Sequence, residues 1–348
     1  MELSPLESIK LFSQKISFLG KLDKQDFLED LASTPHHVLG YRKRARLIQY
    51  QTSKSVKHNI YIVPSLINQY YVLDLFPGCS LIEELLELGF NVTLLDWQNP
   101  RPQDRFASLE EHIFELIDWG FDLSKENSLN EKKWSILGHC IGGTFSIVNQ
   151  CYHQREDISF INLVTPIDFD NNSILSFWSK KVPLNLNLMV KQWGQIHHEF
   201  LQLSFRLMEP MDNIQKYKSL WKKANDRAFL KKYYAIDHWI KDRMDFPGRT
   251  YQEFIERFFR ENNFIRGILE LKGKEIQLHR LKQPVLVVTA SGDHIVEENS
   301  AKALCGRVEG FVDEIELPGG HIGCLLSQKS RNLLTKKIEE FIEVQYAH

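Results

Sequence analysis

The sequence predicts an α/β protein built on a mostly parallel central sheet flanked by helices. Short apolar runs that fit buried strands recur along the chain, and segments with helical spacing of apolar residues lie between them. Strands that alternate with helices favour crossover connections and therefore parallel pairing. The expected strands lie within Val38–Tyr50 and at Ile60–Val63, Phe90–Leu95, Trp134–Leu137, Phe160–Val164, Pro284–Ala290 and Glu314–Leu317, and the expected core helices include Cys79–Leu88 and Leu109–Trp119.

Composition narrows the possible functions. A chain of 348 residues with 43% hydrophobic content can bury a large core and carry an insertion. The formal net charge of -2 and the pI of about 6.7 give no general electrostatic basis for binding nucleic acid or an anionic membrane. Five irregularly spaced cysteines form neither a disulfide framework nor a C-x-x-C metal site. With no transmembrane-length apolar run and no signal peptide, we expect a cytoplasmic protein.

Two segments interrupt the alternation of strands and helices. Residues 1–35 carry apolar residues near helical spacing and predict an N-terminal helical extension. Residues 171–274 are rich in aromatic residues and mainly helical in pattern, and they lie between two expected strands of the sheet. We interpret residues 1–170 and 275–348 as the α/β core and 171–274 as a helical cap over the carboxyl ends of the strands, where such a fold carries its active site.

The segment Trp134–Ser146 reads WSILGHCIGGTFS and has the pattern G-x-C-x-G between an expected strand and an expected helix. A sharp strand-to-helix turn of this kind presents a nucleophile, and glycines flank it because larger side chains would clash. Cys140 is therefore a candidate nucleophile. The pattern alone is equally compatible with a buried structural cysteine, so the rest of the chain has to decide.

An acid and a histidine follow later strands in the order that this architecture requires. Asp293 comes after Pro284–Ala290, and His321 comes after Glu314–Leu317. The order nucleophile, acid, histidine is that of the α/β-hydrolase fold. Each position is a weak signal by itself, but the three together predict a Cys140–Asp293–His321 catalytic triad.

Two backbone amides are candidates for an oxyanion hole. The first belongs to Ile141, which follows the nucleophile, and the second lies in the turn after Ile60–Val63, at Ile67 or Leu66. His294, beside the candidate acid, is equally well explained as its support or as a loop residue that faces solvent.

Eight segments of the chain match a known family: TPHHVLGYRKRARLIQY, PSLINQYYVLDL, NVTLLDWQNP, GHCIGGT, LVTPIDF, FIRGILEL, SGDHIV and GGHIG. Through them the chain resembles the catalytic subunits of polyhydroxyalkanoate synthases of the short, two-subunit (class III-like) type. By this resemblance Cys140 carries the acyl chain, His321 activates it and Asp293 completes the triad. The sequence departs from the family pattern at His139, where an apolar or aromatic residue is usual, and at Glu297, where proline would follow DHIV.

The resemblance implies polymerisation of (R)-3-hydroxyacyl-CoA, with 3-hydroxybutyryl-CoA as the expected substrate, into polyester with release of CoA. It also implies a second synthase subunit, a homodimer and a location at the surface of polymer granules, and no step requires a metal or other cofactor. A thiol suits this chemistry because exchange between two thioesters keeps the acyl group activated. Two alternatives stay open: a cysteine-dependent acyl-CoA thioesterase, and a non-catalytic granule protein.

Overall fold

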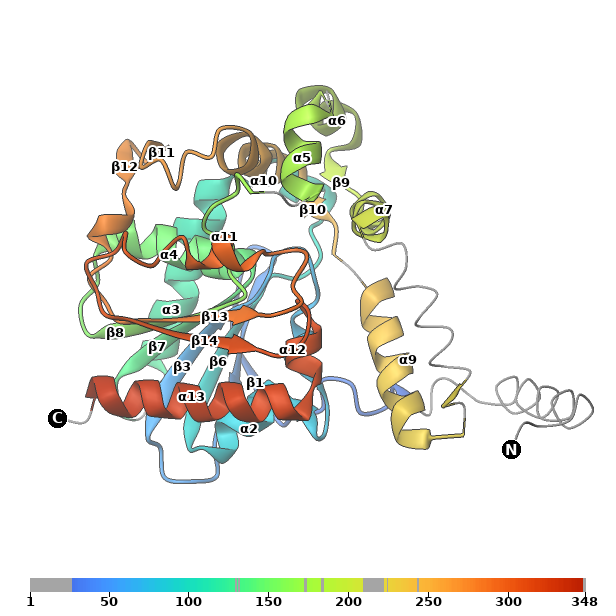
Figure 1. The fold of residues 1–348 in the computed structure, drawn as a ribbon, viewed down its shortest axis with the longest axis vertical. Coiled ribbons are helices and arrows are strands. Elements are labelled where there is room, and N and C mark those ends of the chain that lie inside the picture. Colours follow the sequence, from blue (N-terminus) through green and yellow to red (C-terminus); the bar gives the residue numbers. More distant parts are fainter. Residues whose placement is uncertain are drawn as a thin grey trace, which may run out of the picture.

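The computed structural model describes residues 27–128, 130, 132–171, 174–182, 185–208, 222–223, 225–242 and 244–346. Its centre is an eight-stranded sheet, and helices cover both faces (Figure 1). The predicted α/β class and mostly parallel sheet are therefore confirmed. The helices predicted before residue 27 lie outside the described residues.

The strands of the large sheet follow the spatial order β1-β2-β6-β3-β7-β8-β13-β14. All neighbours from β6 to β14 pair in parallel, whereas β1 and β2 form an antiparallel edge. The bounds in chain order are β1 (His37–Arg42), β2 (Ala45–Tyr50), β3 (His58–Val63), β6 (Phe90–Asp96), β7 (Trp134–His139), β8 (Ile158–Leu163), β13 (Val285–Ala290) and β14 (Val312–Leu317).

Helices pack on both faces because the central strands are apolar on both sides. Ile136 and Phe160 face the layer of α3 and α4, whereas Leu137 and Ile161 face the layer of α2 and α13. The helices of the core are η2 (Tyr70–Leu73), α2 (Leu81–Glu87), η3 (Pro102–Phe106), η4 (Glu111–Leu116), α3 (Ile117–Glu126), α4 (Ile141–His153), η6 (Leu278–Arg280), α11 (Glu298–Lys302), α12 (Gly323–Leu326) and α13 (Gln328–Tyr346).

Among the elements that extend beyond their predicted bounds, one helix and one strand show the reason clearly. The helix expected at Leu109–Trp119 consists of the π-helical turn η4 followed by α3, and it continues to Glu126 because Phe121 is buried against the sheet. Strand β7 runs past Leu137 to His139, since Gly138 and His139 pair with β8 through their backbones. The extension brings the end of β7 directly to Cys140.

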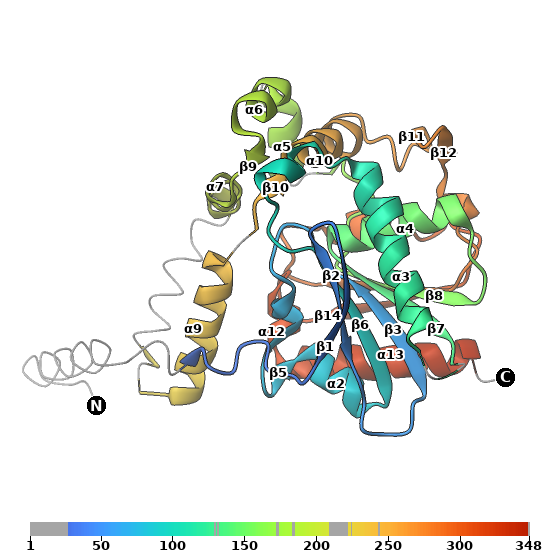
Figure 2. The same ribbon diagram turned by 180° about the vertical axis from the view of Figure 1, so that it is seen from behind.

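The segment between β8 and β13 is mainly helical. Helices α5, α6, α7 and α10 gather beyond one end of the sheet, and α9 stands beside it in both views (Figures 1 and 2). Aromatic rings join this segment to the core. The ring centroids of Phe145 in α4 and Phe254 are 5.8 Å apart, and those of Phe169 and Phe258 are 5.4 Å apart. The helices are α5 (Ile174–Lys181), α6 (Leu186–Trp193), α7 (His198–Met208), α9 (Arg227–Lys241), α10 (Gly248–Phe254) and η5 (Ile255–Arg260).

Short strand pairs complete the described structure. The pairs are β4 (Asp74–Phe76) with β5 (Cys79–Ser80), β9 (Gln195–Ile196) with β10 (Phe246–Pro247), and β11 (Leu269–Leu271) with β12 (Lys274–Ile276). Within the described ranges, no helix combines the length and the apolar character needed to cross a membrane.

Candidate active site

Cys140 occupies a tight turn between β7 and α4. Its backbone has φ 53° and ψ -129°, a positive φ that is uncommon outside glycine and is typical of a strained nucleophile turn. A Cβ atom at Gly138 would overlap the backbone of Gly143, and one at Gly143 would overlap the side chain of Thr165. The Cys140 amide also donates a 3.0 Å hydrogen bond to Leu163 O in β8. The glycines are therefore required by close packing on both sides of the turn.

His321 and Asp293 meet beside this turn. The imidazole Nδ1 donates to Asp293 Oδ2 at 2.7 Å, and both side chains are buried. The Cys140 thiol lies close enough to the same ring to influence its pKa. The amides of Ile295 and Val296 donate to Asp293 Oδ1, each at 2.9 Å, and so fix the carboxylate. The three residues predicted from separate strand ends are thus brought together.

The electrostatics of the group favour a charged histidine. Burial by itself lowers the pKa of His321, but negative charge on Cys140 and the hydrogen bonds to Asp293 and Cys140 outweigh burial and raise it. An imidazolium beside a thiolate is the activated form of a cysteine nucleophile. The arrangement therefore places a ring that can hold a proton beside the candidate nucleophile.

His139 lies behind the catalytic candidates. Its ring is buried, and its centroid is 5.9 Å from that of His321. Within the described part of the chain, neither ring nitrogen has a hydrogen-bond partner. Burial, and to a smaller extent the charge of His321, lowers the pKa of His139 to about 3. This histidine is therefore neutral at physiological pH and adds no competing charge.

The turn Pro64–Gln69 follows β3 and lies against the start of α4. A Cβ atom on Gly142 would overlap the carbonyl oxygens of Val63 and Pro64, so only glycine allows this approach. Ile141 is the first residue of α4, and no residue of the helix can accept its amide proton. In the turn, the Ile67 amide donates to Ser65 Oγ at 3.4 Å. Both segments predicted to supply oxyanion donors are thus adjacent.

His294 is exposed, and the hydrogen bonds that fix Asp293 come from the amides of Ile295 and Val296.

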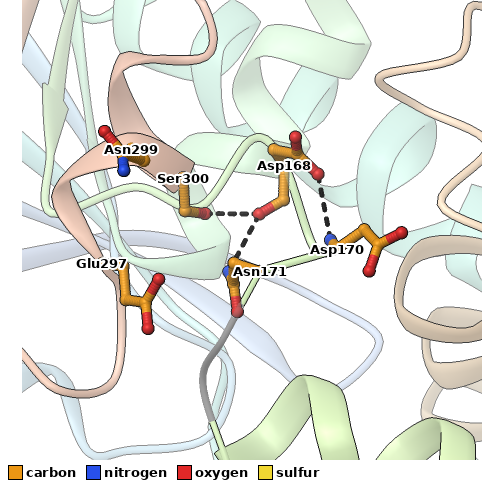
Figure 3. Close-up of a pocket in the computed structure, with 6 residues that line it drawn as sticks. All are labelled: Asp168, Asp170, Asn171, Glu297, Asn299 and Ser300. Atoms are coloured by element: carbon orange, nitrogen blue, oxygen red, sulfur yellow. Dashed lines mark hydrogen bonds between the residues drawn. The ribbon is translucent and has the colours of Figure 1, made fainter.

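A pocket of about 240 Å³ is lined by Asp168, Asp170, Asn171, Glu297, Asn299 and Ser300 (Figure 3). There Ser300 Oγ donates to Asp168 O at 2.6 Å and ties α11 to the loop after β8. In the ranges that the structure describes, no three His, Cys, Asp or Glu side chains are arranged to hold a metal ion.

Sequence reasoning did not identify the side chains that hold the turn Pro64–Gln69. Trp97 Nε1 donates to Pro64 O at 2.9 Å, and Trp239 Nε1 donates to Gln69 O at 2.9 Å. Tyr71 and Gln69 also donate to Asp242. The motif INQYYVLDL contains two of these residues, but nothing in the sequence indicates that their partners lie about 170 positions later.

Comparison with solved structures places the fold. A carboxyl esterase from Bacillus coagulans is 14% identical with a TM-score of 0.58 and covers 88% of this chain and 98% of that one. The mouse α/β-hydrolase domain-containing protein 10 is 14% identical with a TM-score of 0.52, over 89% and 99% of the two chains. These likenesses define an α/β-hydrolase fold, and in this chain Cys140 occupies the strand-to-helix turn between β7 and α4.

Sequence relatives define the family. A family model described as the poly-beta-hydroxybutyrate polymerase (PhaC) N-terminus matches residues 18–85. The chain is 31% identical to the poly(3-hydroxyalkanoate) polymerase subunit PhaC of Thiocystis violacea over 96% of both chains, and 32% identical to that of Allochromatium vinosum over 81% of this chain and 79% of that one. It spans 64% of the longer Haloferax mediterranei subunit, at 28% identity. The chain belongs to the PhaC family of poly(3-hydroxyalkanoate) polymerase subunits.

Proposed function

We propose that this protein is a poly(3-hydroxyalkanoate) synthase that joins (R)-3-hydroxyacyl-CoA units, chiefly 3-hydroxybutyryl-CoA, into polyester through an acyl intermediate on Cys140. The observation that carries the proposal is the hydrogen-bonded pair of His321 and Asp293 beside Cys140, at a tight strand-to-helix turn in a member of the PhaC family. The triad assignment, the donors of the oxyanion hole and the choice of substrate are parts of this proposal.

In the acylation step, His321 takes the thiol proton of Cys140, and the thiolate attacks the thioester carbonyl carbon of the substrate. The carbonyl oxygen becomes negative, and the amide of Ile141 stabilises it together with an amide of the turn Pro64–Gln69, at Leu66 or Ile67. The C–S bond to CoA then breaks, and the CoA sulfur takes the proton from His321. Cys140 now carries the acyl group as a thioester.

In the elongation step, the 3-hydroxyl of an incoming 3-hydroxyacyl-CoA attacks the thioester on Cys140. His321, oriented by Asp293, accepts the hydroxyl proton, the new C–O ester bond forms and the C–S bond to Cys140 breaks. The acceptor thioester survives and can reload the enzyme, so each cycle adds one ester bond. Water at this stage would release a free acid, and the aromatic packing of Phe145 against Phe254 supports a dry site.

The proposal extends to partners and location. We infer a second synthase subunit, a homodimer and attachment to the surface of polymer granules. Exposed apolar side chains on the helical segment support a surface that meets another apolar surface. They are Phe177 on α5, Leu188 and Trp193 on α6, and Leu203 on α7.

The test follows CoA release and product mass with 3-hydroxybutyryl-CoA, using purified protein alone and with soluble extract of its host. We expect ester-linked oligomers or polymer, and a loss of at least ~10³-fold in Cys140→Ala and His321→Gln. Cys305→Ala serves as the control because Cys305 is a half-buried thiol that the proposed mechanism does not use. Free 3-hydroxybutyrate as the sole product would instead indicate a thioesterase, and polymer from Cys140→Ala would contradict the thiol mechanism.

A further inference from the structure

The turn Pro64–Gln69 is anchored at both ends by tryptophan indoles. At its start, Trp97 of the core donates to Pro64 O, and at its end Trp239 of α9 donates to Gln69 O, both at 2.9 Å. Trp97 and Trp239 are buried. One anchor therefore directly follows β6 of the sheet and the other belongs to the helical segment, although both act on the same six residues.

Asp242 strengthens the anchor at the Gln69 end. Its Oδ2 accepts a 2.8 Å hydrogen bond from the Tyr71 hydroxyl, and its Oδ1 accepts a 3.4 Å hydrogen bond from Gln69 Nε2. Gln69 is thus held through its carbonyl by Trp239 and through its side chain by Asp242. Burial raises the pKa of Tyr71, and the hydrogen bond to Asp242 raises it further, so the hydroxyl keeps its proton and donates.

The position of Asp242 is unfavourable for the helix on which it lies. It is the C-cap of α9, where the helix dipole disfavours a negative charge. A cation or a neutral side chain would stabilise this end better. Since the carboxylate does not help α9, the bonds to Tyr71 and Gln69 are the better explanation for its presence.

We propose that Trp239 and Asp242 are positioning residues that hold the turn Pro64–Gln69 so that its amide points at the carbonyl oxygen of the reacting thioester. This inference rests on the proposed function, because it concerns the same oxyanion hole. It makes the position of α9 a condition for acylation, since displacing α9 would release the Gln69 end of the turn. Neither residue contacts the reacting atoms, so both act through the turn.

Two reactions of Cys140 separate positioning of the turn from general damage. Alkylation by iodoacetamide needs the thiolate but develops no oxyanion, whereas acylation by 3-hydroxybutyryl-CoA needs both. We expect Asp242→Asn and Trp239→Phe to slow single-turnover CoA release about 10-fold or more, since losing an oxyanion donor outright costs ~10²–10³-fold. Alkylation should change less than about twofold. Lys241→Gln is the matched control. Lys241 is next to Asp242 in the sequence, but its side chain is exposed and pairs with Asp237 at the surface.

Hydrogen exchange of the peptide spanning residues 64–69 tests the same inference without any substrate. We expect faster exchange in Asp242→Asn, Trp239→Phe and Tyr71→Phe, and unchanged exchange in Lys241→Gln. Unchanged exchange in all variants, or an equal loss of acylation and alkylation, would overturn the positioning role. Failure of the proposed function would be distinct: wild-type Cys140 would react with iodoacetamide but not with 3-hydroxybutyryl-CoA, whatever the exchange data show.

Discussion

The two backbone segments that meet at the site are built in different ways. The turn around Cys140 is fixed by its own small residues, because Gly138 and Gly143 allow close packing that any side chain would prevent. The turn Pro64–Gln69 has only a long local hydrogen bond, from the Ile67 amide to Ser65 Oγ, and its two ends are held by the side chains of Trp97 and of Trp239 in α9. The turn around Cys140 is therefore locally encoded, whereas the turn beside it depends on contacts made only in the folded chain.

The most damaging substitution should be one that pushes the two segments apart. In Gly142→Ala, the new Cβ would overlap the carbonyl oxygens of Val63 and Pro64, and relieving the overlap requires a shift of α4 or of the end of β3. We expect about 3 kcal/mol of destabilisation and ~10²-fold slower CoA release. Urea unfolding and single-turnover assays measure both. Gly323→Ala is the control, since a Cβ there meets no atom within 4 Å; equal behaviour of the two variants would refute the steric explanation.

A second variant examines the core end of the turn. Trp97→Phe keeps most of the buried ring but removes the N–H that donates to Pro64 O. We expect about 10-fold slower acylation of Cys140 with near-normal alkylation, and a loss of about 1 kcal/mol in stability. In the double variant Trp97→Phe/Trp239→Phe, acylation should slow by less than the product of the two single effects. The reason is that both substitutions loosen the same turn.

The control for that cycle is Trp134→Phe, at the opposite end of β7 from Cys140. Its ratio of acylation to alkylation should equal that of wild type. Fully additive effects of Trp97→Phe and Trp239→Phe would show that the two anchors hold independent structures.

The smallest expected effect concerns the other side of the nucleophile turn. The pKa of His139 is lowered to about 3 in the folded protein, against about 6.5 when it is unfolded. Between these values the unfolded state binds the proton and the folded state does not, so stability falls as the pH falls. His139→Phe has no such proton to bind. The difference in unfolding free energy between this variant and wild type should therefore be ~1 kcal/mol more favourable to the variant at pH 6 than at pH 8. Urea unfolding at both pH values tests this, and a pH-independent difference would contradict it.

Much of the core could be predicted because its signals are local. Apolar runs located the strands of the large sheet to within a few residues, and G-x-C-x-G located the turn at Cys140 because steric crowding dictates glycine there. The helix at Leu109–Trp119 was predicted too short, since burial of Phe121 extends it and burial is not visible in a periodic pattern. The roles of Cys140, Asp293 and His321 stay a prediction, which their observed proximity supports.

The anchors of the turn Pro64–Gln69 could not be predicted in the same way. A tryptophan that donates to a distant carbonyl has no sequence pattern, because its partner is a backbone atom that every residue carries. Trp239 and Asp242 also lie about 170 positions from Gln69 and Tyr71, on a helix whose apolar spacing explains them equally well as ordinary packing. Only a pairing in space distinguishes the two interpretations.

The order of the strands and helices along the chain, and the kinds of side chain that follow each strand, could be inferred from the sequence. Backbone sterics and apolar periodicity act over a few residues, so a linear pattern records them. The tertiary structure alone decided which side chains share a buried environment. It brought His321 within 2.7 Å of Asp293, left the ring of His139 without partners among the described residues, and put α9 against the turn beside Cys140. The physical reason is that hydrogen bonding and desolvation depend on distance in space, which the spacing of residues along the chain does not specify.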